Sequence, residues 1–134
     1  MLTLSPAHIE ALVATSIRAL PNEGCGLLLG LRDQNGGVVT EVVPSHNVAD
    51  SAKVYEIDSK VLLRTYRRAD DEGLEVLGVF HSHTHSEAYP SPTDIAQAPD
   101  PVWHYVLVSL RDQIAVVRSF RIVNGSVTEE ELVR

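Results

Sequence analysis

Two histidines and an aspartate have the residue types and the spacing of metal ligands. His81 and His83 are separated by a single residue where an apolar segment ends, and alternate residues of an extended chain point to the same side. Ser91 and Pro92 are typical of a helix start, so Asp94 falls in the first helical turn and can point back towards the imidazoles. Two imidazoles and one carboxylate leave the fourth position of a tetrahedral zinc ion open, as in catalytic zinc sites. We therefore predict one zinc ion per chain, held by His81, His83 and Asp94.

Glu23 is the candidate general base for such a zinc site. Zinc lowers the pKa of a bound water from about 15.7 to about 7, but cleavage of an amide also requires that a proton reach the departing amine. A nearby carboxylate can carry that proton. Glu23 lies between the first expected helix and the first expected strand, next to glycines that allow close backbone approach. Ser91 is the candidate donor to the oxyanion of the tetrahedral intermediate.

Each of these residues also has an ordinary structural interpretation. Ser91 and Asp94 fit a capping box, in which the two side chains bond each other's backbone at a helix start, and this role is compatible with a role in the site. Glu23 taken alone is typical of a solvated loop carboxylate. Cys25 is more simply a small buried residue at the start of a strand. No firm role is assigned to the other polar residues expected near the site, which are His46, Asn47, His85 and Glu87.

Helices and strands in alternation are expected around this site. Apolar residues at helical spacing from Ile9 to Leu20 predict a helix that packs on a core and ends at Pro21. Asn124-Gly125 predicts a tight hairpin turn. The expected helices are 6–20, 58–70 and 92–98, and the expected strands are 27–31, 38–43, 74–80, 102–110, 114–123 and 126–130. Together they predict a single α/β domain over residues 1–134, with a mixed, mainly antiparallel sheet sandwiched by helices.

The composition restricts the class of protein. The chain has 134 residues, of which 44% are hydrophobic and 22% charged, as in ordinary globular domains. A net charge of −7 without a basic stripe argues against a nucleic-acid partner. The N-terminal residues lack the features of a signal peptide, and no membrane span is expected. The single cysteine excludes a multi-cysteine zinc site and fits a reducing compartment, so we expect a cytoplasmic protein.

The complete pattern resembles the JAMM motif of MPN+ metalloproteases. In that motif H-x-H is followed by seven residues, a serine, two residues and an aspartate, with a glutamate upstream, and this chain matches it without a gap. The matching residues are His81, His83, Ser91, Asp94 and Glu23. The resemblance implies the MPN fold, an α/β sandwich, with zinc as cofactor. It also implies cleavage of peptide or isopeptide bonds beside the C-terminal tails of ubiquitin-like proteins.

Further segments resemble the bacterial Mec-type hydrolases, which release cysteine from the C-terminus of a ubiquitin-like sulfur-carrier protein. These segments are 87–91, 104–109 and 119–130, so the resemblance covers nearly the whole chain. It implies a sulfur-carrier protein or a peptide as the partner. Two alternatives stay open, namely a general small-peptide or isopeptide hydrolase with the same mechanism, and a non-catalytic MPN binding module. Such modules characteristically lose the ligands that are present here. No oligomeric state is set by the sequence.

Other metal-dependent classes require residues that this chain lacks. His81, His83 and Glu87 resemble half of a cupin motif, but the second half is absent and the expected helices do not fit a jelly roll. Histidine-triad nucleotide hydrolases place apolar residues between the histidines, whereas Ser82 and Thr84 are polar. A metallo-β-lactamase would require H-x-H-x-D-H, and a zinc deaminase would require paired cysteines. These classes are therefore disfavoured.

Overall fold

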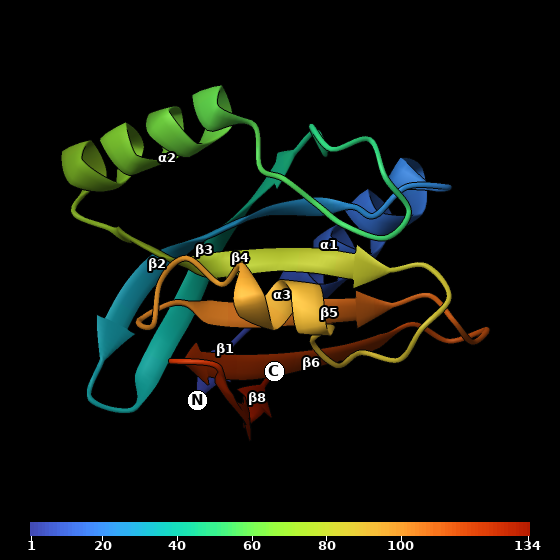
Figure 1. Cartoon of the computed structure of the whole chain (residues 1–134). Helices are drawn as coiled ribbons and strands as arrows, with labels where there is room; N and C mark the ends of the chain where they lie inside the picture. The colour runs from blue at the N-terminus through green and yellow to red at the C-terminus, as the bar shows by residue number, and fades with distance from the viewer.

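An eight-stranded mixed sheet runs through the molecule, and the computed structural model describes all 134 residues (Figure 1). The strands are β1 (Leu2–Thr3), β2 (Cys25–Asp33), β3 (Gly36–Ser45), β4 (Glu75–His83), β5 (His104–Ser109), β6 (Val116–Val123), β7 (Ser126–Glu130) and β8 (Leu132–Val133). The helices are α1 (Pro6–Ala19), α2 (Ser59–Glu72) and α3 (Pro92–Ala96). Along the sheet the strands follow the order β7-β6-β5-β4-β2-β3-β1-β8. The pairs β4–β5, β1–β3 and β1–β8 are parallel and the other four are antiparallel, so the sheet is mixed as predicted.

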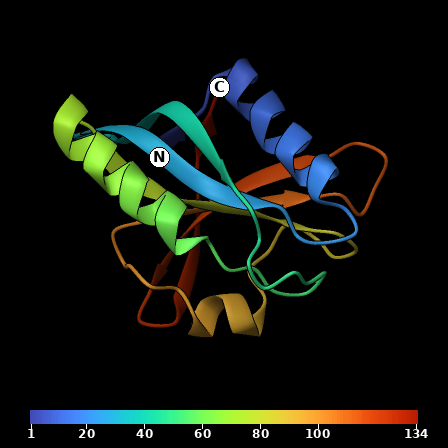
Figure 2. The same ribbon diagram turned by 90° about the horizontal axis from the view of Figure 1, so that it is seen from above.

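The helices cover both faces of this sheet, and α1 lies on the opposite side from α3 (Figure 2). On the α1 face, Leu12 packs in a buried cluster with Leu28 of β2. On the other face, Ala69 of α2 and Ile95 of α3 pack against a cluster that contains Leu27. Each fully buried leucine contributes about 1.5–3 kcal/mol, so two cores fix the helices against the sheet. The predicted sandwich is confirmed. None of the three helices has the length and apolar character needed to cross a membrane.

In the last turns of α1 the buried residues are not the apolar ones that the sequence predicts. Ile17 is 54% exposed and Leu20 is 46% exposed, so neither belongs to the core. The buried positions in these turns are Thr15 and Ser16. A Cβ atom on Gly24 would lie only 2.9 Å from Cα of Ser16, so the segment after α1 approaches too closely for large side chains. The glycine therefore allows the close backbone approach that was expected, and the helix meets it with small residues.

The strand boundaries differ from the predicted ones in two situations: some strands continue through polar residues, and some apolar residues expected in a strand lie outside it. β4 continues beyond Phe80 through His81 and His83, because both remain paired with neighbouring strands. β6 begins only at Val116, and Ile114 is 81% exposed in the preceding turn. β1 and β8 are absent from the prediction, since strands of two residues are too short to show alternation.

A buried polar cluster joins the C-terminal strands to the start of the chain. His104 of β5 is fully buried, and its Nδ1 lies 2.6 Å from Oε2 of Glu130. Ser119 Oγ donates to the same oxygen at 2.7 Å, and the amino group of Met1 donates to Oε1 at 2.9 Å. Burial by itself raises the pKa of Glu130, but these hydrogen bonds outweigh it and lower the pKa to about 2. The ionised carboxylate therefore fastens β5, β6 and β7 together.

We expect acid to weaken the fold through Glu130. Because its pKa is about 2 in the folded chain and ordinarily 4.5, ionised Glu130 stabilises the fold above pH 4.5, and this contribution is lost as the pH falls from 4.5 towards 2. The difference corresponds to about 3 kcal/mol at neutral pH. Glu130→Gln should lower the free energy of unfolding at pH 7 by about that amount, measured by urea denaturation, and should flatten its decline in acid. Glu131→Gln, at the neighbouring exposed residue, is the control. An unchanged decline in acid for Glu130→Gln would contradict this role.

Candidate metal centre

The three predicted ligands lie together at the end of β4. Nε2 of His81 is 3.0 Å from Oδ2 of Asp94, and Nε2 of His83 is 3.1 Å from the same oxygen. Both imidazoles are buried, and the ligand atoms of the three residues lie within 4.8 Å of one another. The residues expected to converge from two separate elements therefore do converge.

The register of β4 positions the two histidines. His81 is paired with Cys25 on β2 and with Leu107 on β5, so the strand is held on both edges. Side chains alternate along β4, and Val79 belongs to the core cluster beneath α2 and α3. His81 and His83 follow Val79 at intervals of two residues. Both imidazoles therefore point to the face that carries α3.

Asp94 is held at the start of α3 by the capping box that the sequence suggested. Oγ of Ser91 accepts from the amide of Asp94 at 3.0 Å, and Oδ2 of Asp94 accepts from the amide of Ser91 at 2.9 Å. The same Oδ2 atom faces both imidazoles, so the cap directs the carboxylate towards them. A hydroxyl that accepts can still donate its own hydrogen. The structural role of Ser91 is therefore compatible with a role in the site.

Contacts behind the imidazoles fix the orientation of each ring. Nδ1 of His83 lies 2.8 Å from the carbonyl oxygen of Glu87, and since a carbonyl only accepts, Nδ1 carries the hydrogen. In neutral His83, the lone pair of Nε2 then faces Oδ2 of Asp94. Because both atoms carry lone pairs, this contact is favourable only when a proton or a metal ion lies between them. Tyr55 stacks on His81, with ring centroids 4.2 Å apart and planes inclined by 18°. No sequence pattern pointed to Tyr55.

The protonation states in this cluster suit a metal. Burial lowers the pKa of His81 despite its hydrogen bond to Asp94, so this imidazole is neutral. Burial alone raises the pKa of Asp94, but hydrogen bonds with both imidazoles hold it well below its usual range. Burial also opposes a charge on His83, whereas the bonds to Asp94 and Glu87 raise its pKa overall. Metal ligation needs a carboxylate and bare imidazole nitrogens, and Asp94 presents the carboxylate. Neutral His81 presents a bare Nε2 when its hydrogen is on Nδ1, an atom that has no hydrogen-bond partner, and His83 presents a bare Nε2 after releasing a proton. The nitrogen and oxygen donors fit zinc.

Glu23 lies beside the cluster and is buried rather than solvated. Continuing the antiparallel register of β2 against β4 places Glu23 opposite His83. The residue is 3% exposed, and its Oε1 atom has no hydrogen-bond partner. Burial raises the pKa of Glu23 to about 8, with His83 opposing the shift and Asp94 adding to it. The interpretation of Glu23 as a solvated loop carboxylate is therefore wrong.

Two cavities that share no lining residue reach the cluster. The polar cavity, named for the residue types of most of its lining, measures about 440 Å³ and is lined by Glu23, His83 and Ser91. Its other lining residues are Ala52, Lys53, Thr84, His85 and Ser86. A second cavity of about 260 Å³ is lined by Asp94 and is rich in apolar side chains, among them Tyr55, Ile57, Leu62, Val79 and Trp103. The residues on one side of the cluster are therefore mostly of polar type, and those on the other side are mostly of apolar type.

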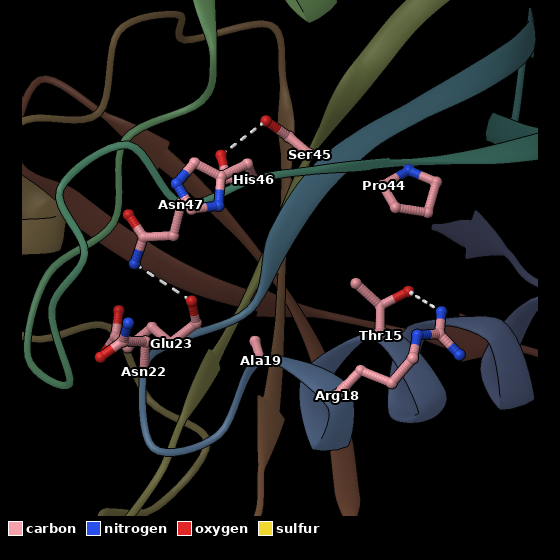
Figure 3. Close-up of a pocket in the computed structure, with 9 residues that line it drawn as sticks. All are labelled: Thr15, Arg18, Ala19, Asn22, Glu23, Pro44, Ser45, His46 and Asn47. Atoms are coloured by element: carbon pink, nitrogen blue, oxygen red, sulfur yellow. Dashed lines mark hydrogen bonds between the residues drawn. The ribbon is translucent and has the colours of Figure 1, made fainter.

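Asn47 fastens the loop after β3 to the backbone of Glu23 (Figure 3). Its Nδ2 atom lies 3.0 Å from the carbonyl oxygen of Glu23, 3.3 Å from that of Ser51 and 3.0 Å from that of Val54. Its Oδ1 atom accepts from two further amide groups of the loop. Asn47 thus lies near the site as expected, but as the anchor of a loop, a role that sequence alone did not assign.

The remaining residues near the site have structural contacts. Cys25 is buried, and burial together with Glu23 raises the pKa of its thiol to about 12, so the thiol stays protonated and unreactive. His85 lines the polar cavity, with Nδ1 2.8 Å from Oγ1 of Thr84. Glu87 contributes its backbone carbonyl to His83. The expectation of a structural Cys25 agrees with this arrangement.

Proteins of known fold or function are similar to this chain. Residues 5–123 match the profile described as prokaryotic homologs of the JAB domain. A CysO-cysteine peptidase of Mycobacterium tuberculosis is 41% identical over 123 residues, which cover 91% of this chain and 83% of that protein. A desampylase of Haloferax volcanii is 34% identical over 90 residues, which cover 66% of this chain and 63% of that protein. The solution structure of protein DSY2949 from Desulfitobacterium hafniense has a TM-score of 0.92 at 37% identity, covering 99% of this chain and 92% of that one.

We expect Asn47→Ala to destabilise the protein. The substitution leaves the buried carbonyl oxygen of Glu23 and several loop groups without their partner. At about 1 kcal/mol for each lost hydrogen bond, the free energy of unfolding should fall by about 2–4 kcal/mol, measured by urea denaturation. Asn22→Ala is the matched control, because its amide bonds only to the side chain of Asp50 at the surface and should change stability by less than about 0.5 kcal/mol. Equal stability of the two variants would show that Asn47 does not anchor the loop.

Proposed function

This chain belongs to the family of prokaryotic homologs of the JAB domain, and we propose that it is a zinc-dependent hydrolase acting at the C-terminus of a ubiquitin-like carrier protein. The JAMM resemblance and the predicted MPN fold are thereby confirmed. The observation that carries the proposal is the convergence of His81, His83 and Asp94 beside the buried carboxyl of Glu23. Residues 1–134 are taken as one metallohydrolase domain.

We assign the metal to Nε2 of His81, Nε2 of His83 and Oδ2 of Asp94, the three atoms that face one another. Zinc at such a site supplies a Lewis acid that polarises a carbonyl oxygen and acidifies a water molecule. The hydrogen bond from His83 to the carbonyl of Glu87 supports the assignment, because ligating histidines usually donate their second nitrogen in this way. The stacked ring of Tyr55 keeps His81 in a single orientation.

Glu23 is the proposed base and proton carrier. Its carboxylate takes a proton from the attacking water as the water oxygen bonds to the carbonyl carbon, and it delivers that proton to the leaving nitrogen as the C–N bond breaks. A pKa raised to about 8 by burial keeps the group near the range in which it can both accept and deliver a proton. The unpaired Oε1 atom is free for this exchange. Ser91 is proposed to donate its hydroxyl hydrogen to the oxyanion.

The proposed substrate is a ubiquitin-like sulfur-carrier protein that bears a C-terminal cysteine. The similarity to a CysO-cysteine peptidase, at 41% identity over 91% of this chain, supports this choice. The second candidate is a broader peptide or isopeptide hydrolase with the same chemistry, which the similarity to a desampylase favours. Rates of cleavage of a carrier–cysteine adduct and of ordinary dipeptides distinguish the two. Equal specificity constants for both would contradict the carrier as the preferred substrate.

Glu23→Gln should abolish turnover while the metal stays bound. Glutamine keeps the shape of the side chain but cannot carry a proton, so we expect kcat to fall by at least about 100-fold. Cleavage of the carrier–cysteine adduct and metal analysis of the same preparation measure the two effects. Glu10→Gln, at an exposed residue of α1, is the control. Normal turnover by Glu23→Gln would require a different base.

Asp94→Ala should lose the metal and the activity together. The substitution removes the anionic ligand and one arm of the capping box, which costs about 1 kcal/mol of stability, so circular dichroism should show a folded chain. We expect one zinc per chain in the unaltered protein and much less in the variant, measured by atomic emission. A chelator should inactivate the unaltered protein and added zinc should restore it. A folded, metal-free protein that is active in chelator would exclude both zinc chemistry and this ligand set.

A further inference from the structure

The polar cavity beside the ligand cluster carries a cation that the proposed hydrolysis does not use. Lys53 lines this cavity together with Glu23, His83 and Ser91. None of the ion pairs of the folded chain includes Lys53. Glu23 is the single acidic residue in the lining. A chain of net charge −7 therefore presents a free ammonium group next to its reactive site.

We propose that Lys53 binds the free carboxylate of the leaving residue and so selects substrates from which a single C-terminal residue is released. This inference rests on the proposed hydrolase function and adds the substrate class. A conjugate in which the leaving amine belongs to a lysine side chain offers no such carboxylate beside the cleaved bond. Lys53 is thus a specificity-determining residue.

The proton carrier decides which cavity holds the leaving group. Glu23 must deliver a proton to the leaving nitrogen, and it lines the polar cavity but not the apolar one. The pocket of Figure 3 is also lined by Glu23, but none of the three ligands lines it. Its cation, Arg18, donates to Thr15 on its own helix. The leaving group therefore belongs in the cavity that Lys53 lines.

Covalent geometry brings the carboxylate of a single leaving residue into the same cavity. In a C-terminal amino acid the carboxylate carbon is bonded to the Cα that carries the leaving nitrogen, so the two atoms are about 2.5 Å apart. In an isopeptide the leaving nitrogen stands at the end of a long side chain, and any main-chain carboxylate is several bonds further away. One cation within this cavity can therefore distinguish the two kinds of substrate. Charge-assisted hydrogen bonds between ammonium and carboxylate are the suitable contact.

The backbone that carries Lys53 is fixed relative to Glu23. The amide of Lys53 donates to Oγ of Ser51 at 3.0 Å, and the carbonyl of Ser51 accepts from the amide of Glu23 at 2.8 Å. Asn47 holds Ser51 and Val54 on either side of Lys53. The side chain of Lys53 is exposed and extends from this fixed backbone. The backbone therefore needs no reordering when a carboxylate enters, and only the side chain of Lys53 becomes ordered.

The test compares a carrier–cysteine adduct with a free C-terminal carboxylate and the same adduct as the C-terminal carboxamide. The unaltered protein should cleave the carboxylate with a kcat/KM about ten-fold higher. Lys53→Gln should remove this preference through a higher KM for the carboxylate, with the carboxamide unaffected. Lys53→Arg should retain the preference because it keeps the cation. Lys60→Gln, which removes the other lysine of the chain at an exposed position of α2, should behave as the unaltered protein.

The outcomes separate this inference from the proposed function. Equal cleavage of carboxylate and carboxamide by the unaltered protein would overturn the role of Lys53 and leave the hydrolase standing. A preference that persists in Lys53→Gln would overturn it as well. If neither adduct is cleaved by zinc-loaded protein, the proposed function fails and the inference fails with it. Urea denaturation of Lys53→Gln should match the unaltered protein, since the side chain is exposed.

Discussion

One carboxylate oxygen, Oδ2 of Asp94, holds the functional part of this molecule together. It faces Nε2 of His81 and Nε2 of His83 and accepts a hydrogen bond from the backbone of Ser91. The end of a central strand and the start of a short helix therefore meet at a single atom. A buried carboxylate without partners costs several kcal/mol, so this oxygen is stable here only while positive or hydrogen-donating groups surround it. The remaining features of the site are arranged around that requirement.

The sheet brings the general base to the ligands from a different part of the chain. Glu23 precedes β2, and the antiparallel pairing of β2 with β4 sets it opposite His83. Gly24 packs closely against α1, Asn47 binds the backbone carbonyl of Glu23, and Glu23 itself is buried. Desolvation in turn gives the carboxyl its high proton affinity. The position of Glu23 in the sheet and its burial thus determine its protonation behaviour.

The ligands could be predicted from sequence because local geometry decides where they point. His81 and His83 are two residues apart on one strand and so point to the same face, and Ser91 forms a local helix cap with Asp94. Strand alternation and helix capping were therefore sufficient to predict their directions. The burial of Glu23 could not be predicted in the same way, because it depends on contacts between segments far apart in the chain. The ring of Tyr55 on His81 depends likewise on the path of a loop.

The fold shows the same division between local and long-range information. Helix starts, the Asn124-Gly125 turn and the apolar strands follow from local patterns and are present. Ile17 is exposed although it continues the apolar stripe of α1, and the residues of that turn that are buried, Thr15 and Ser16, are the ones that Gly24 approaches. Strands β1 and β8, at one end of the sheet, are too short to show an alternating pattern. They form by pairing with each other and with β3.

The bond from His83 to the main chain at position 87 has a consequence for variation in this segment. Because the acceptor is a peptide oxygen, exchanging the glutamate for another amino acid leaves the imidazole tether in place. Adding or removing a residue between the two positions would instead carry that oxygen away from the ring. Position 87 is therefore permissive in composition while the segment from 83 to 87 is strict in length, and insertions are better tolerated elsewhere on the surface.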